Sequence, residues 1–252
     1  MPKTYPRMLS VLFLWLFAAG VQAADGTVLF ATGNVALYRG TTPIAIAVGD
    51  PVNMGDAFST GADGIVRWKM SDNSYYAIGP NTQMRIENYH MPEVTEPPST
   101  GRVLLRLFKG LMRTATGLIG HRNPSGWALK TPTATLGIRG SIFTTMVVYD
   151  GTTYSQFEEG SGFIQGKDGQ TKDMGTGESY QATNDGGANQ SQDAANKIND
   201  AKQNAGGEFN TALNTGDTTQ TQQQQQDQQQ DQQQDQQQDQ QTSPRIEGDS
   251  AQ

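Results

Sequence analysis

The sequence predicts an all-β fold, and three observations support that prediction. Short apolar runs with a two-residue alternation recur between residues 25 and 182. Clusters of Gly, Asp, Asn and Pro separate these runs at intervals of about 8–12 residues, and no stretch before residue 183 has a helical period. This pattern is typical of a sandwich, a roll or a solenoid-like stack of many short strands rather than of an α/β fold.

Individual strands can be placed from the alternation of apolar and polar residues. In residues 64–70 and again in residues 82–89, every second side chain is apolar, which is the pattern of a half-buried strand. The stretch 141–149 is instead apolar on both faces, so we expect a strand that is covered on each side. The residues expected on the inner face of the first two strands are Val66, Trp68, Met70, Met84 and Ile86.

The composition of the chain changes near residue 183. We predict one β domain over residues 25–182, a linker over 183–219, and a disordered tail over 220–252. Residues 220–241 comprise 17 Gln, four Asp and one Thr, a composition that cannot bury enough apolar surface to fold. Within the linker we expect a short helix over 188–205, because Ala194, Ile198, Ala201 and Ala205 share one helical face.

The first 23 residues have the organisation of a secretory signal peptide. Lys3 and Arg7 precede an apolar run over residues 8–19, and small residues lead to a predicted cleavage between Ala23 and Ala24. The alternative is an uncleaved membrane anchor, although the run is shorter than the roughly 20 residues of a spanning helix. We therefore expect a periplasmic or secreted protein without a stable membrane span after cleavage.

Charge and cysteine content exclude several classes of function. From residue 24 on, 16 Lys and Arg stand against 25 Asp and Glu, which gives a formal charge of −9. Such a chain is not suited to coating nucleic acid or to binding an anionic lipid surface by charge. Cysteine is absent, so disulfides, thiol chemistry and Cys-ligated zinc are excluded.

The sequence shows no catalytic constellation, and we expect neither an enzyme nor a cofactor or metal site. His90 and His121 lie 31 residues apart beside loops, and neither HExxH nor GxSxG occurs. Four acids that could suggest calcium are spaced too widely for a calcium loop and fall in turns, where Asp bonds nearby backbone. These are Asp50, Asp56, Asp63 and Asp72.

The segment 130–143 is the most distinctive stretch of the body. Arg139 lies between Gly137 and Gly140, next to an apolar strand. We interpret its side chain as a buried organiser of loop carbonyls; the alternative is a side chain presented to a partner. If the body contacts a partner through cations, the candidates are Arg113, Lys130 and Arg139.

Five motifs in chain order resemble those of FecR domains, over about Gly33 to Tyr180. The most specific is Lys130-Thr-Pro-Thr-Ala with Gly137-Ile-Arg-Gly-Ser-x-Phe143. The others are Gly49-Asp-x-Val-x-x-Gly-Asp-x-Phe-x-Thr-Gly-x-x-Gly64, Asp72-Asn-Ser74 with Ile78-Gly-Pro-Asn81, Lys109-Gly-x-Met-Arg113, and Glu159-Gly160 with Gly177-Glu178. Asn73 and Ser141 depart from the family, which usually has Gly and Thr there.

The resemblance implies a periplasmic binding module. Family members that regulate iron uptake add a cytoplasmic sigma-handling region and a membrane span, for which the seven residues before the apolar run leave no room. We therefore expect an exported, non-enzymatic module that binds another envelope protein. The alternatives are a structural surface or matrix protein extended by its Gln-rich tail and, more remotely, a carbohydrate-binding protein that stacks sugars on Trp68 and Trp127.

Overall fold

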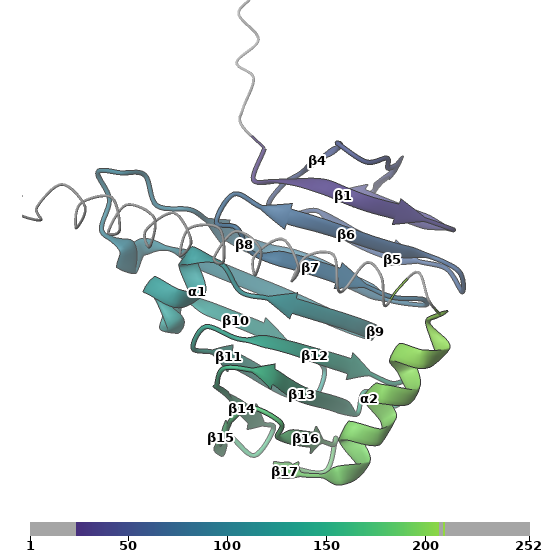
Figure 1. Ribbon diagram of the computed structural model, residues 1–252, viewed down its shortest axis with the longest axis vertical. Coiled ribbons are helices and arrows are strands. Elements are labelled where there is room, and N and C mark those ends of the chain that lie inside the picture. Colours follow the sequence, from purple (N-terminus) through teal and green to yellow (C-terminus); the bar gives the residue numbers. More distant parts are fainter. Residues whose placement is uncertain (1–23, 207–208, 210–252) are drawn as a thin grey trace, which may run out of the picture.

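A computed structural model of the chain describes residues 24–206 and residue 209. The predicted signal peptide and the predicted tail over 220–252 lie outside these residues. Strands dominate the described part, which confirms the all-β prediction (Figure 1). Seventeen strands form one hydrogen-bonded network there, and this network folds into two facing sheets that share one long strand.

Sheet A, as we call the first, consists of antiparallel pairs. From one edge to the other its strands are β4 (Pro51–Val52), β1 (Gly26–Thr32), β6 (Ile65–Met70), β7 (Tyr75–Ile78), the second half of β9 (Arg102–Ala115), β12 (Ile142–Val147), β13 (Thr153–Glu159), β16 (Ser179–Ala182) and β17 (Ala188–Gln190).

Sheet B lies behind sheet A in Figure 1 and contains the one parallel pair of the described network, β9 with β10. Its order is β3 (Thr42–Ala45), β2 (Val35–Arg39), β5 (Ala57–Thr60), β8 (Gln83–His90), the first half of β9, β10 (Trp127–Lys130), β11 (Ala134–Ile138), β14 (Gly162–Gly166) and β15 (Thr171–Met174). Successive hairpins alternate between the sheets, so the chain advances steadily along the stack.

Strand β9 joins the two sheets at Gly110. Up to Lys109 it pairs with β8 and β10, and from Gly110 onward it pairs with β7 and β12. Gly110 has φ +94°, and a Cβ there would stand 2.4 Å from the Cα of Thr82. The Thr82 hydroxyl accepts a hydrogen bond from the Leu111 N–H at 2.9 Å. Glycine at this position therefore permits the change of sheet.

Aromatic side chains from both sheets fill the space between them. Trp68 of sheet A stacks on Phe58 of sheet B, with ring centroids 4.5 Å apart. Further along, Trp127 of sheet B meets Phe143 of sheet A edge-on at 5.6 Å. All four rings belong to one continuous core and are at most 2% exposed. The inward orientation predicted for residues 64–70 and 82–89 is confirmed, because the five residues expected inside are all buried.

Two asparagines adopt a backbone conformation that is typical of glycine, and one short helix was not predicted from the sequence. Asn73 adopts φ +64°, so it fills the left-handed position at which the family usually has glycine. Asn81 does the same with φ +54°. Helix α1 (Leu118–Arg122) is one turn flanked by the 3₁₀ segments η1 (Pro98–Thr100) and η2 (Pro124–Gly126); five residues are too few to give a helical period in the sequence.

Helix α2 (Gln192–Asn204) lies within the stretch 188–205 in which a helix was expected, but the first residues of that stretch, Ala188–Gln190, form strand β17 instead. Ser191 caps the helix by accepting a hydrogen bond from the Ala194 N–H. The helix packs on β12, β13 and β16 (Figure 1), and β17 pairs with β16. The composition change at residue 183 therefore does not coincide with the end of the packed structure, since part of the predicted linker lies against sheet A. None of the helices in the described ranges has the length and apolar character needed to span a membrane.

Candidate binding face

The outer faces of the two sheets are covered differently. On sheet A, Ile198 of α2 is fully buried among Tyr154, Met146 and Val148. Phe209, also fully buried, packs further along the same face with Ile65, Ala77 and Leu111. Among the residues that the structure describes, the long helix α2 packs on strands of sheet A, whereas sheet B has contacts with only the short segments α1 and η2, at β9 and β11. The outer face of sheet B, on which no long helix packs within residues 24–206 and 209, is therefore the candidate for binding.

A row of three cations crosses the centre of this face. Arg85 of β8 is the cross-strand partner of Arg106 of β9, and Arg106 is the partner of Lys130 of β10. Their inward neighbours Met84, Leu105 and Leu129 are buried in the core, so the alternation of each strand directs the cations outward. Neighbouring strands lie about 4.8 Å apart, so the charges are close together. We call these three residues the basic row.

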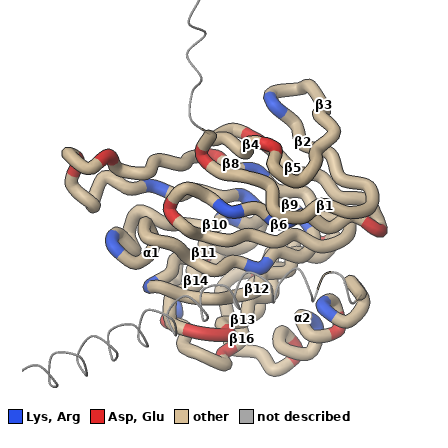
Figure 2. The backbone as a smooth tube through the Cα atoms, turned by 45° about the horizontal axis from the view of Figure 1, so that its top comes forward, with Lys and Arg blue, Asp and Glu red and all other residues tan. Residues whose placement is uncertain are grey.

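The row is only partly neutralised. Arg106 forms an ion pair with Glu87 of the neighbouring strand, and the Arg85 guanidinium donates to the carbonyl of Gly55 at 3.3 Å. In the described part of the chain, no ion pair or hydrogen bond is found for the Lys130 ammonium. In Figure 2, blue segments that mark Lys and Arg lie in the region of the labels β8, β9 and β10. The face thus presents cations with spare capacity to bind.

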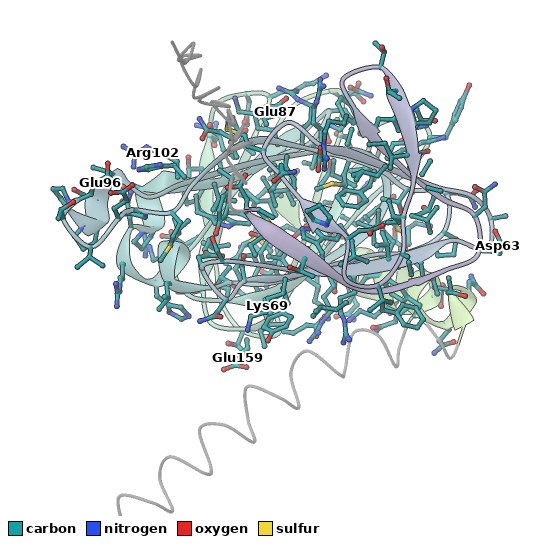
Figure 3. All side chains as sticks on the ribbon, turned by 90° about the horizontal axis from the view of Figure 1, so that it is seen from above. Asp63, Lys69, Glu87, Glu96, Arg102 and Glu159 are labelled. Carbon is teal, nitrogen blue, oxygen red and sulfur yellow. The ribbon has the colours of Figure 1, made fainter. Side chains whose placement is uncertain are left out.

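Apolar and polar groups surround the basic row. Phe108 is 46% exposed, and its ring centroid lies 6.0 Å from the guanidinium carbon of Arg106. Leu104 and Phe163 are half-buried on the same face. Past Lys130, the register continues through Thr135 and Gln165. In Figure 3, Glu87 of this face and Lys69 of sheet A project from opposite sides of the molecule. The outer faces of the two sheets therefore point in opposite directions.

The three cations proposed from the sequence do not form one site. Lys130 lies in the basic row, half-buried. The Arg139 side chain is 63% exposed in the turn after β11, 3.9 Å from the Asp173 carboxylate. The interpretation of Arg139 as a buried organiser is wrong, because β11 ends at Ile138 and the following turn directs the side chain to solvent. Its backbone N–H, not its guanidinium, binds the Ser161 carbonyl, at 2.7 Å.

Arg113 belongs to the opposite sheet, where it is buried. Its guanidinium contacts the Glu158 carboxylate at 3.0 Å, and Lys202 of α2 contacts the other oxygen of that carboxylate at 2.6 Å. The Thr144 hydroxyl donates to the same group at 2.7 Å. Burial alone would raise the pKa of Glu158, but Arg113 and Lys202 outweigh it and lower the pKa to about 2. This cluster attaches α2 to the sheet.

Comparison with known proteins gives a family match for part of the chain. The family model described as "FecR protein" matches residues 56–161, which run from just before β5 to just past β13. We call this matched region the FecR domain. It includes the basic row and the change of sheet at Gly110, whereas β2, β3, β14 and β15 of sheet B lie outside it. No curated protein matches the chain.

Two solved structures are similar to part of the chain. Both are described as crystal structures of a "putative anti-sigma factor" from Parabacteroides distasonis. They share 12% and 14% sequence identity with the chain, each with a TM-score of 0.42. In both cases 54% of this chain and 58% of the other chain are covered, so the match spans little more than half of those proteins.

Most of the FecR motif residues form turns rather than a site. The Asp56 carboxylate accepts the Asn53 N–H and two hydrogen bonds from Arg39, each at 2.9 Å. Asp72, fully buried, accepts the Ser74 N–H at 3.0 Å. Asp50 likewise accepts the Ala47 N–H, whereas Asp63 accepts the N–H of Asn34, 29 positions away in the sequence. The prediction that these acids bond the backbone of their own turns is therefore confirmed for Asp50, Asp56 and Asp72, and Asp63 instead joins two separate segments.

The histidines of the FecR domain do not face each other. The Nε2 atom of His90, the last residue of β8, lies 3.0 Å from the Glu96 carboxylate, and both side chains are exposed. His121 lies in α1, close to Gly140, where a Cβ would stand 2.5 Å from the imidazole ring. Both histidines are exposed and lie apart from each other, and no group of three His, Asp or Glu in the described ranges is arranged to hold a metal ion.

A cavity of about 330 Å³ lies at one end of the molecule, between α1 and the long loop that precedes η1. Its wall is mainly apolar, with Met91, Pro92, Leu118 and Ile119 among the lining residues, and Glu93, Glu96 and Arg122 are charged groups on it. Figure 3 shows Glu96 and Arg102 at this end, away from the centre of the sheets. Its wall carries neither a nucleophile–base pair nor an unpaired buried charge.

Sugar stacking on the tryptophans is excluded by their burial. Trp68 is 0% and Trp127 is 2% exposed. The inward position expected for Trp68 is confirmed, and Trp127 lies inward as well, so neither ring offers a face to a glycan. The inward position of Trp127 could be predicted from the alternation of residues 127–130, because Trp127 and Leu129 share one side of β10.

Sequence reasoning placed Arg85 on the polar side of its strand but did not find the basic row. The row depends on which residues of β8, β9 and β10 stand opposite one another, and the parallel β9–β10 pairing joins Val103 to Trp127, 24 positions further along the chain. Alternation within one strand carries no information on that register. The polar positions of residues 102–108 were the available signal, because Arg102 and Arg106 alternate with buried Val103, Leu105 and Leu107.

Proposed function

We propose that this chain is an exported, non-enzymatic FecR-like module of the bacterial cell envelope that binds another envelope protein. The observation that carries the proposal is the outer face of sheet B around the basic row, on which no long helix packs among the described residues. Arginine and aromatic side chains beside half-buried apolar groups are the composition enriched at protein interfaces. The signal-like residues 1–23 support a periplasmic or secreted location.

The strongly shifted ionisable groups support a binding rather than a catalytic role. Glu158, with its pKa near 2, is held by Arg113 and Lys202 between α2 and sheet A. Burial raises the pKa of Tyr76 and of Tyr89, which lie in the core. All three groups are used in packing and none lines the cavity beside α1. Shifted groups that mark active sites usually sit in a cleft instead.

The binding proposal is tested by affinity capture from a periplasmic extract. The full chain, tagged at its C-terminus and expressed with its own leader, is recovered and its bound proteins are identified by mass spectrometry. We expect one envelope protein to be retained in near-equal amount, and an unrelated exported β protein with the same tag to retain none of it. Failure of the chain to retain any envelope component would argue against the proposal.

Export is tested separately. N-terminal sequencing of the recovered protein should begin at Ala24, and Ala23→Arg should leave a longer chain because signal peptidase requires a small residue before the cut. Recovery of the protein in the cytoplasmic fraction would contradict the proposed location.

A further inference from the structure

The basic row costs stability, which calls for an explanation. Like charges directly opposite each other on neighbouring strands destabilise a sheet. Arg85 and Arg106 stand directly opposite, as do Arg106 and Lys130, and Glu87 relieves only Arg106. A sheet under no other constraint would alternate the signs of these charges. The row is therefore best explained by a negatively charged partner that lies across the three strands.

The charge of the rest of the folded part makes the row distinctive. Residues 24–209 carry 15 Lys and Arg and 18 Asp and Glu, a formal charge of −3. The exposed Arg139 lies beyond the far side of the row, and Arg102 lies at the end of the molecule near Glu96 (Figure 3). Beside the row, Glu87 pairs with Arg106, and Asp173 lies 3.9 Å from Arg139. Positive charge is thus concentrated on one face of an acidic molecule.

The mixture of charged, apolar and polar side chains on the outer face of sheet B indicates what kind of partner it binds. A second copy of the chain would place the same three cations against each other in a symmetric dimer, which repulsion disfavours. An anionic membrane attracts clusters of four to eight cations, whereas this face intersperses its cations with Phe108, Leu104, Thr135 and Gln165. A broad sheet surface of this mixed kind matches a folded protein with an acidic patch.

We propose that the outer face of sheet B is the docking surface for a protein that presents a cluster of carboxylates to Arg85, Arg106 and Lys130. Arg106, held by Glu87 beside Phe108, lies at the centre of the surface. Arg85 and Lys130 provide the flanking charges. This inference rests on the proposed function and adds the face, the residues and the chemistry of the partner.

The first experiment uses a 20-residue poly-glutamate peptide as the probe, added to the isotope-labelled full chain. We expect amide shifts in β8, the first half of β9 and β10, and at least tenfold weaker binding at 300 mM than at 50 mM salt. The variant Arg85→Glu/Lys130→Glu should weaken binding at least tenfold. Lys69→Glu/Lys197→Glu changes the net charge equally at positions on sheet A and α2, away from the row, and should weaken it less than threefold.

Two results of this titration would overturn the proposal. One is a set of shifts centred on other strands, and the other is equal weakening by both charge-reversed variants, which would indicate a response to net charge alone. A third concerns the acidic residues 210–252. If Asp227→Asn, Asp231→Asn, Asp235→Asn and Asp239→Asn together tighten peptide binding tenfold in the full chain, those residues occupy the face in place of a partner.

The second experiment locates the partner on the surface in cells. A photo-crosslinking benzoylphenylalanine replaces Phe108 on the face or Tyr149, which is fully exposed in the turn after β12. We expect an adduct from position 108 that Arg85→Glu/Lys130→Glu removes, and none from position 149. Capture of a partner that survives the charge reversal overturns this inference and leaves the proposed function standing, whereas capture of nothing by the unmodified chain overturns both.

Discussion

Gly110 shows how one residue determines the path of the longest strand. It has φ +94°, and Thr82 occupies the space that a side chain would need. Gly49 has the same φ of +94° but no atom within 4 Å of an added Cβ. The two glycines thus share the backbone conformation and differ in the available space, which allows the two costs of a substitution to be separated.

We predict that Gly110→Ala destabilises the protein by about 2–4 kcal/mol, whereas Gly49→Ala costs about 1 kcal/mol. The left-handed conformation alone costs about 1–2 kcal/mol for an L-residue, and the contact with the Thr82 backbone adds to it only at Gly110. Urea unfolding followed by circular dichroism measures both values. Equal losses in the two variants would mean that the close approach of Thr82 and Gly110 has no energetic weight.

Glu158 makes the stability of the protein depend on pH, because its pKa differs between the folded and the unfolded chain. The folded protein lowers the pKa from an ordinary value of 4.5 to about 2. A lowered pKa means that the unfolded chain binds the proton first as the pH falls. The stabilisation is therefore complete above about pH 5 and is lost progressively towards pH 2.

We predict that Glu158→Gln removes up to about 3 kcal/mol of stability at pH 7 and less as the pH approaches 2, since each pKa unit corresponds to about 1.4 kcal/mol. The profile of unfolding free energy against pH should be flatter in the variant between pH 5 and 2. Glu159→Gln, at the exposed neighbouring position, should keep the slope of the unmodified protein. A Glu158→Gln profile parallel to that of the unmodified protein would contradict the role of Arg113 and Lys202.

Among the elements, helix α2 is held on sheet A by side-chain packing and an ion pair. Its apolar stripe is thin, yet Ala194 and Ile198 are both fully buried against sheet A. The Lys202 contact with Glu158 adds a charged link near its last turn. The helix therefore completes the covering of sheet A, and its removal would expose the outward side of β12.

We predict that Ile198→Ala destabilises the whole protein by about 2–4 kcal/mol, the usual cost of removing a buried isoleucine side chain to alanine. Lys197→Ala, at an exposed position of the same helix, should change stability by less than about 0.5 kcal/mol. Chemical denaturation supplies both numbers. If Ile198→Ala left the midpoint unchanged, α2 would be a loosely attached segment, as the composition of residues 183–219 suggests.

At the scale of elements, the sequence predicted the strands in which apolar and polar side chains alternate. It also predicted the helix whose apolar residues recur at helical spacing. Residues 141–149 were expected to be covered on each side, and β12 indeed lies with Phe143 in the core and Met146 against α2. Strand β9 was not predicted, because exposed Phe108 and Lys109 follow each other directly before Gly110 and break the alternation. The basic row was not predicted either, since it exists only through pairing between strands.

For the molecule as a whole, the core connects two halves that the sequence separates by the loop over residues 92–99. Trp68 lies with Phe58 and Tyr76 in the first half, and Trp127 lies with Phe143 in the second. Both groups belong to the same buried cluster, and β9 pairs with strands of both halves. A core and a strand shared in this way favour one cooperative unfolding transition.

We predict that both halves unfold together. From residue 24 on the chain has two tryptophans, so Trp68→Phe leaves a reporter of the second half and Trp127→Phe a reporter of the first. In each variant, the urea midpoint from tryptophan fluorescence should equal the midpoint from circular dichroism of the same sample, although each substitution lowers stability. Separate midpoints for the two probes in either variant would show that the halves are independent units. In that case β9 would be a connection between two domains, and the basic row, whose strands β8, β9 and β10 span the junction, would depend on how those domains are held together.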